Sequence, residues 1–109
     1  MVRIAIDCMG GDQAPSAIID GSLRSLAATK DTKLFLFGPE GLLKEELQKS
    51  AKAAGVSEAD LAARIEICDA AEVISLHEAP VLAIRRKKDS SIVKGLHFVK
   101  EGHADAFIS

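Results

Sequence analysis

Cysteine is scarce in this chain of 109 residues, and its two positions, Cys8 and Cys68, lie 60 residues apart and outside any Cys-x-x-Cys pattern. This spacing argues against a zinc ribbon and a disulfide framework, and it fits a reducing, cytoplasmic compartment. Long apolar runs are also missing, because Arg3 and Asp7 interrupt the apolar N-terminus. The sequence therefore predicts neither a membrane-spanning helix nor a signal peptide.

Neither sign of charge is in large excess. Lys and Arg total 14 and Asp and Glu total 16, which gives a formal net charge of −2. This balance argues against a general binder of nucleic acid or of anionic membranes. Hydrophobic residues make up 48% of the chain and charged residues 28%, as in soluble globular proteins. At about 100 to 200 residues per domain, this length suffices for one domain at most.

Short apolar runs alternate with stretches whose apolar residues recur at helical spacing. We predict strands at residues 2–6, 34–37, 65–68 and 104–108. We predict helices at residues 15–29, 42–55, 80–88 and 90–101, the last with Ile92, Leu96 and Val99 as its apolar positions. Ser57 and Asp60 resemble a capping box for one further helical turn. This alternation favours an α/β fold with three α/β/α layers around an open, doubly wound, mostly parallel sheet of Rossmann-like topology.

A pair of glycines follows the first predicted strand. In sheets of this kind ligands bind beyond the carboxyl ends of the strands, so the segments to search first are residues 7–14, 38–41 and 69–79. Within the first of these, Gly10 and Gly11 would let backbone amides approach an anion. The segment is neither a Gly-x-Gly-x-x-Gly nor a Walker A loop, and Asp7 and Asp12 would repel a bare phosphate unless a cation intervened. Spacing alone therefore favours an ordinary tight turn in which Asp12 caps a helix.

A run of four cations at residues 85–88 is followed by Asp89, Ser90 and Ser91. Without the four cations the remaining charge is 10 − 16 = −6, so the run is an island of positive charge. Cations, hydroxyls and a helix N-terminus are the usual components of an oxyanion site, which suits phosphate or an acidic partner. The alternative is structural, since such cations contribute about 0.3 to 1 kcal/mol each at a helix C-terminus and an N-cap about 1 kcal/mol. The residues by themselves leave both interpretations open.

Other reactive side chains show no arrangement typical of catalysis. The three histidines, at positions 77, 97 and 103, are not at metal-ligand spacing, so no metal is predicted. Cys8 has no histidine near it in sequence, and packing is its favoured role. Ser90 and Ser91 lack the Gly-x-Ser-x-Gly pattern of an acyl-enzyme nucleophile. No catalytic triad can be assembled, and no cofactor is predicted.

Taken together, these motifs resemble a known family. Residues 4–12 with Ala14 and Pro15, the basic segment 85–91, and residues 101–109 are similar, in this order, to the N-terminal portion of the bacterial phosphate acyltransferases (PlsX). The resemblance spans the whole chain. Cys8 stands where alanine is usual in the family, which weakens any catalytic role for its thiol.

The resemblance implies a fold of the isocitrate and isopropylmalate dehydrogenase type and a homodimer. It implies a reaction in which acyl-acyl carrier protein and inorganic phosphate give acyl phosphate and free carrier protein, in phospholipid synthesis. Phosphate itself attacks the thioester, so no protein nucleophile and no cofactor are required. The protein would be cytoplasmic, with possible peripheral contact to the inner face of the membrane through regions absent from this chain.

Under this resemblance the candidate site residues fall into two groups. The candidates for binding phosphate or substrate are Asp7, Gly10, Gly11, Asp12, Lys88, Ser90 and Ser91. The candidates for docking acyl carrier protein are Arg85, Arg86 and Lys87. The catalytic residues are not assigned and are expected to include positions beyond Ser109.

Two alternatives stay open. One is a nonenzymatic nucleotide or small-molecule binding module of flavodoxin-like topology, and the other is an inactive fragment. The family is several times longer than 109 residues, so we expect residues 1–109 to be an N-terminal α/β segment of a larger acyltransferase domain, cut at the end of its fourth strand. Such a segment would leave an apolar face uncovered.

Overall fold

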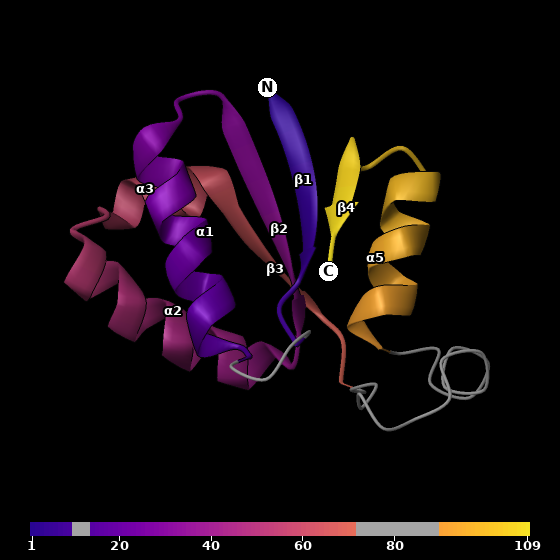
Figure 1. Ribbon diagram of the computed structural model, residues 1–109, viewed down its shortest axis with the longest axis horizontal. Helices are drawn as coiled ribbons and strands as arrows, with labels where there is room; N and C mark the ends of the chain where they lie inside the picture. Colours follow the sequence, from indigo (N-terminus) through magenta and orange to yellow (C-terminus); the bar gives the residue numbers. More distant parts are fainter. Residues whose placement is uncertain (10–13, 72–89) are drawn as a thin grey trace.

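A computed structural model describes residues 1–9, 14–71 and 90–109 of the chain, and Figure 1 shows their arrangement around a single sheet. The elements in chain order are β1 (Val2–Asp7), α1 (Ser16–Ala28), β2 (Thr32–Gly38), α2 (Glu40–Ala54), α3 (Glu58–Arg64), β3 (Ile65–Asp69), α5 (Ser91–Lys100) and β4 (Ala106–Ile108). Each of these elements was predicted from the sequence at nearly the same position. The helix predicted at residues 80–88 lies outside the described residues.

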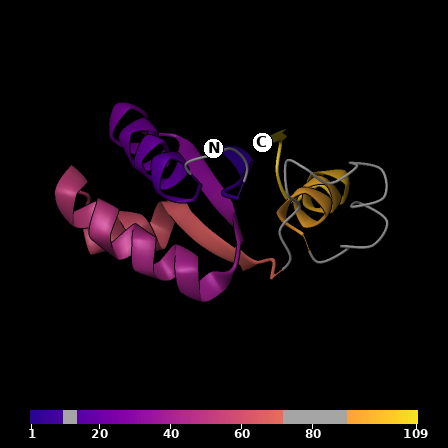
Figure 2. The same cartoon turned by 60° about the horizontal axis from the view of Figure 1, so that its bottom comes forward.

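The four strands form a parallel sheet in the order β3-β2-β1-β4. From β1 the chain steps outward to β2 and β3 through α1, α2 and α3, and it then returns to the other side of β1, where α5 precedes β4. Figure 2 shows the first three helices on one face of the sheet and α5 on the other. The predicted three-layer, doubly wound α/β fold is confirmed. The order of strands reverses between β1 and β4, which is the switch point where such sheets bind ligands.

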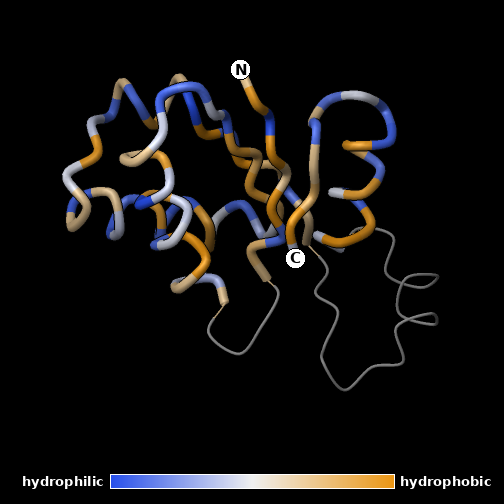
Figure 3. The backbone as a smooth tube through the Cα atoms, turned by 45° about the horizontal axis from the view of Figure 1, so that its top comes forward, coloured by the Kyte–Doolittle hydropathy of each residue, from blue (hydrophilic) through white to orange (hydrophobic). Residues whose placement is uncertain are grey.

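Alternating side chains of the strands build a separate core on each face of the sheet. Ile4, Ile6, Leu34 and Leu36 join the cluster that includes α1 and α2. Ala5, Phe35 and Phe37 join the smaller cluster beneath α5. Because helices cover both faces, the middle of each of these strands, residues 4–6 of β1 and 34–37 of β2, is continuously apolar, as Figure 3 shows by colour.

The small core beneath α5 is largely aromatic. The ring of Phe98 on α5 lies 4.7 Å from the ring of Phe35 and 5.3 Å from that of Phe37, measured between centroids. Both pairs are inclined rather than stacked face to face, at 53° and 69°, and each such pair is worth about 0.5 to 1.5 kcal/mol beyond its burial. These contacts fix α5, and with it the residues that begin it, against β2.

Local signals set the ends of the helices. Gly55 follows α2 with a φ of 70°, the left-handed conformation that favours glycine, and its amide donates to the Ala51 carbonyl. Ser57 accepts a hydrogen bond from the Asp60 amide at 3.2 Å, which is the first half of the predicted capping box. The helix that follows, α3, has seven residues and so is longer than the single turn predicted.

The apolar face predicted for α5 is wrong at Leu96, whose side chain is 49% exposed. The helix turns Val93 and Gly95 inward instead. A Cβ atom at Gly95 would overlap the ring of Phe107 on β4, so this glycine allows helix and strand to approach closely.

The last strand is shorter than predicted, since β4 begins at Ala106 rather than at position 104. The carboxylate of Asp105 accepts a hydrogen bond from the Arg3 amide at 2.9 Å. The Arg3 amide thus donates to the side chain of Asp105. If the pairing of β1 and β4 continued, this amide would donate to a backbone carbonyl instead. Among the described residues, no helix is long and apolar enough to cross a membrane.

Candidate functional site

Asp7 and Ser109 meet at the carboxyl edge of the sheet, at the switch point. Ile6 pairs with Ile108 in the register of β1 and β4, so the residues that follow them lie side by side. The Ser109 hydroxyl donates to Oδ2 of Asp7 at 3.0 Å, and the Met9 amide donates to Oδ1 at 2.9 Å. Asp7 is only 3% exposed, so a carboxylate is buried at the switch point and held from two sides.

The amino end of α5 lies at the same edge. Ser90 is the N-cap, and its hydroxyl accepts a hydrogen bond from the Val93 amide at 3.3 Å. Ser91 is 3% exposed, and its hydroxyl has no hydrogen-bond partner among the described residues. A buried hydroxyl without a partner is rare in folded proteins, because it costs about 1 to 3 kcal/mol. The amino end of α5 therefore has a polar group available for a ligand.

A small cavity joins the two groups of residues. Asp7 and Met9 line one side of it and Ser90, Ser91 and Ile92 the other. Its volume of about 10 Å³ is near the space that one water molecule needs. An oxyanion could therefore place one of its oxygens there, against a helix N-terminus that favours negative charge.

The structure thus brings three predicted site residues together: Asp7, Ser90 and Ser91. Other predicted site residues lie outside the described residues: Gly10, Gly11, Asp12, Arg85, Arg86, Lys87 and Lys88. Sequence reasoning missed Ser109. Its signal would have been its place one residue after a strand that pairs with β1, but the sequence alone did not reveal that β1 and β4 are neighbours.

The helix that follows β2 provides a contrast. The amide of Glu40 in the first turn of α2 donates to Oδ1 of Asp69 at 3.0 Å, so a carboxylate of the chain itself already occupies that helix end. The first turn of α5 has no acidic residue. In addition, Lys94 on α5 donates to the Asp69 carbonyl at 2.8 Å. Of these two helix ends, the amino end of α5 is the better suited to a bound anion.

The cysteine beside Asp7 is not suited to nucleophilic attack. Cys8 is fully buried, and burial together with the neighbouring Asp7 charge raises the pKa of its thiol to about 12. The thiol is therefore protonated at neutral pH. Cys68, which is half-buried, also has its pKa raised, to about 11, by burial and by Glu66. The predicted packing role of Cys8 is confirmed.

Other parts of the surface are less suited to chemistry. A groove of about 760 Å³ lies between α2 and α3, toward the amino edge of the sheet, with Leu47, Val56 and Leu61 among its lining residues. The described residues that line it include no cysteine, histidine or serine. Over residues 1–9, 14–71 and 90–109, no group of three or more His, Cys, Asp or Glu side chains is placed to hold a metal ion.

Comparison with known proteins finds a matching family model and related sequences. The family model described as fatty acid synthesis protein matches residues 2–109. The chain is 47% identical over 108 residues to a phosphate acyltransferase of Clostridium beijerinckii and 47% identical over 108 residues to one of Bacillus pumilus. It is 43% identical over 108 residues to a phosphate acyltransferase of Caldicellulosiruptor bescii.

These alignments cover 99% of this chain but only 29% to 30% of the three relatives. The chain thus spans about 30% of the length of the curated relatives that it matches. The family match nevertheless extends over almost every residue, from the first strand through the last. The chain belongs to the fatty acid synthesis protein family.

Proposed function

We propose that the protein containing this chain transfers an acyl group from acyl carrier protein to inorganic phosphate. Relatives at 43% to 47% identity are named phosphate acyltransferase, which supports the reaction class. The observation that carries the proposal within this chain is the buried, unpartnered hydroxyl of Ser91 at the amino end of α5. That hydroxyl and the helix end are donors suited to phosphate.

The chemistry needs no nucleophile from the protein. A phosphate oxygen attacks the carbonyl carbon of the acyl thioester, and a new C–O bond forms. The C–S bond then breaks, and the sulfur of the carrier leaves and takes up a proton. The protein has to hold phosphate close to the thioester and stabilise the developing oxyanion. This account fits the protonated, buried thiol of Cys8, which takes no part.

In this proposal, residues of this chain bind the phosphate substrate. Ser91 and the amino end of α5 bind phosphate, with Ser90 holding the helix end in shape. Gly10, Gly11 and Asp12 would border the same phosphate, and Lys88 would add a positive charge. Arg85, Arg86 and Lys87 would dock the acidic surface of acyl carrier protein.

The wider setting is part of the same proposal. The protein would act as a homodimer in the cytoplasm, with peripheral contact to the inner face of the membrane through regions outside this chain. Acyl phosphate would then be consumed in phospholipid synthesis. The residues described here would form an N-terminal α/β segment of the acyltransferase domain, without the whole catalytic site.

The central test is Ser91→Ala in the complete protein. We expect the KM for phosphate to rise about tenfold, which corresponds to about 1.4 kcal/mol, while the KM for acyl carrier protein stays unchanged. Steady-state release of free carrier, measured at varied phosphate and then at varied acyl-acyl carrier protein, gives the two constants. The matched control is Ser22→Ala, since Ser22 is also a buried helical serine but donates to the Ile18 carbonyl.

An unchanged KM for phosphate in the Ser91→Ala variant would contradict the assigned site. A complete protein that binds nucleotide or flavin tightly, and forms no acyl phosphate, would contradict the reaction itself. The basic segment is tested separately. We expect Lys88→Ala to raise the phosphate requirement and Arg86→Glu to weaken the affinity for acyl carrier protein, and unchanged values would remove those two roles.

A further inference from the structure

We propose that Asp7 makes this site selective for oxyanions that carry a proton, so that phosphate binds and sulfate is rejected. The inference rests on the proposed function, because it concerns the phosphate site at the amino end of α5. It adds a basis for anion specificity and assigns that specificity to one side chain.

The geometry that supports it is a buried carboxylate facing a site for an anion. Asp7 borders the same cavity as Ser91, and both are 3% exposed. At this depth water screens the charge of Asp7 poorly, and an anion held by the Ser91 hydroxyl lies beside the Asp7 carboxylate. A ligand oxygen near Asp7 must therefore bring a hydrogen atom or meet repulsion.

Asp7 still has the capacity to accept such a hydrogen. Its Oδ1 accepts one hydrogen bond, from the Met9 amide, and its Oδ2 accepts one, from the Ser109 hydroxyl. A carboxylate has about four sites for accepting hydrogen bonds, so each oxygen can take another donor. Met9 and Ser109 also hold the carboxylate in place, which leaves it little freedom to turn away from a ligand.

Phosphate and sulfate, the two common tetrahedral oxyanions, differ in whether they carry a proton at neutral pH. Inorganic phosphate carries at least one proton at neutral pH and can donate it in a charge-assisted hydrogen bond to Asp7. Sulfate carries none and can present only charged oxygens. The repulsion expected between Asp7 and a bare phosphate is thus removed by the proton on phosphate, and no metal cation is required for this purpose.

The experiment measures anion affinities of the complete protein by calorimetric titration with phosphate, arsenate and sulfate at constant ionic strength. Arsenate is protonated like phosphate and serves as the positive comparison. We expect phosphate and arsenate to bind at least tenfold more tightly than sulfate. In Asp7→Asn, whose amide can donate to any oxyanion, we expect the preference for phosphate over sulfate to fall to about one.

The substitution preserves the local contacts. The oxygen of an asparagine at this position can still accept from the Met9 amide, and its nitrogen can donate to Ser109, whose hydroxyl then accepts. Asp105→Asn is the matched control, because Asp105 lies at the opposite end of the β1–β4 pair and forms its pair with Arg3. We expect that control to keep the full preference for phosphate.

Three outcomes would overturn the inference. Wild-type protein that binds sulfate as tightly as phosphate would overturn it without any variant. An Asp7→Asn protein that keeps the wild-type preference would overturn it while leaving the phosphate site itself intact. Failure of the wild-type protein to bind any of the three anions would overturn it together with the proposed function. Failure of the proposed reaction alone would be seen as selective phosphate binding at this site without any formation of acyl phosphate.

Discussion

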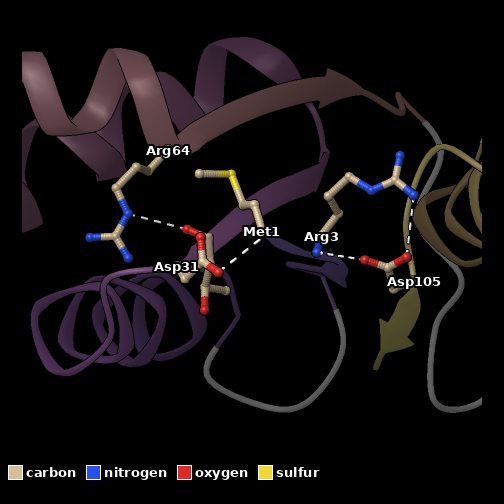
Figure 4. A network of polar contacts seen from close by, with 6 residues as sticks. Met1, Arg3, Asp31, Arg64 and Asp105 are labelled. Carbon is tan, nitrogen blue, oxygen red and sulfur yellow. Dashed lines mark hydrogen bonds and ion pairs between the residues drawn. The ribbon is translucent and has the colours of Figure 1, made fainter.

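The two edges of the sheet use their polar side chains in different ways. At the amino edge, shown in Figure 4, Arg3 pairs with Asp105 at 3.2 Å and the N-terminal amine of Met1 pairs with Asp31 at 3.6 Å. These groups are largely exposed and have partners within the chain. At the carboxyl edge, Asp7 and Ser91 are buried, and Ser91 has no partner among the described residues.

This difference suggests that polar groups at the amino edge serve stability and that those at the carboxyl edge serve ligand binding. Exposed ion pairs like those at the amino edge contribute little, about 0 to 1 kcal/mol each. A buried hydroxyl without a partner costs stability, and a ligand that supplies the partner offsets this cost. The comparison therefore predicts that changes at the amino edge alter folding alone, whereas changes at the carboxyl edge alter the binding of phosphate.

The largest effect is expected from Gly95→Ala, which disturbs the carboxyl edge through packing. The new Cβ would overlap the ring of Phe107, so helix α5 must move away from β4. We expect a loss of about 3 kcal/mol in the free energy of unfolding, measured by denaturation with urea, and a raised KM for phosphate in the complete protein. Gly21→Ala in α1 is the matched control, because nothing lies within 4 Å of its added Cβ. A Gly95→Ala protein of wild-type stability would show that helix and strand are not tightly packed.

The next effect in size is expected from Arg64→Met at the amino edge. The Arg64 guanidinium donates to the carbonyls of Leu26 at 3.0 Å, Thr29 at 2.7 Å and Thr32 at 3.2 Å. It thus supplies a positive charge to the carboxyl end of α1, whose own last turn has no basic residue. We expect a loss of about 2 kcal/mol in stability and an unchanged KM for phosphate. A changed KM for phosphate would show that the amino edge also affects phosphate binding, contrary to this comparison.

The effect expected from Cys8 depends on pH and is smaller when counted for each pH unit. The pKa of its thiol is raised from 9.0 to about 12 in the folded chain, so its contribution to stability is complete below pH 9 and is lost as the pH rises toward 12. In Cys8→Ala we expect the free energy of unfolding to fall less steeply in that range, by roughly 1 kcal/mol per pH unit. Unfolding by urea at several alkaline pH values measures the difference. If the free energy of unfolding fell equally with pH in the two proteins, the pKa of the Cys8 thiol would not be raised by burial.

The smallest effect is expected from Asp105→Asn. Hydrogen bonds from the Arg3 amide and side chain lower the pKa of the Asp105 carboxyl below 3.8. Its stabilising effect is therefore present above pH 3.8 and is lost as the pH falls through the lowered value. We expect the variant to show a slightly weaker loss of stability in acid and no change in phosphate binding. An acid unfolding curve steeper than that of the wild type would contradict this sign.

Most of the fold could be predicted from the sequence, because local patterns decide most of it. The apolar runs at residues 34–37 and 65–68 and the glycine at position 55 are enough to predict two strands and the end of α2. Leu96 shows the limit of this approach. Periodicity predicts an apolar stripe but not which side of it meets the sheet, and here the close approach of Gly95 to Phe107 decides.

The site could be predicted in part. Asp7, Ser90 and Ser91 stand out in the sequence because they follow a strand or begin a helix, and the structure places them around one cavity. Ser109 does not stand out, since its contact with Asp7 depends on the pairing of two strands far apart in the chain. Neighbouring residues in the sequence also do not determine whether a buried hydroxyl has a hydrogen-bond partner. That Ser91 is buried without a partner follows from the packing of α5 against the sheet.

The most direct test of the carboxyl-edge site is a crystal structure of the complete protein with inorganic phosphate. The account predicts phosphate at the amino end of α5, with one oxygen within hydrogen-bond distance of the Ser91 hydroxyl and another facing the Asp7 carboxylate. Phosphate bound elsewhere, with the Ser91 hydroxyl bonded to another group of the protein, would contradict it.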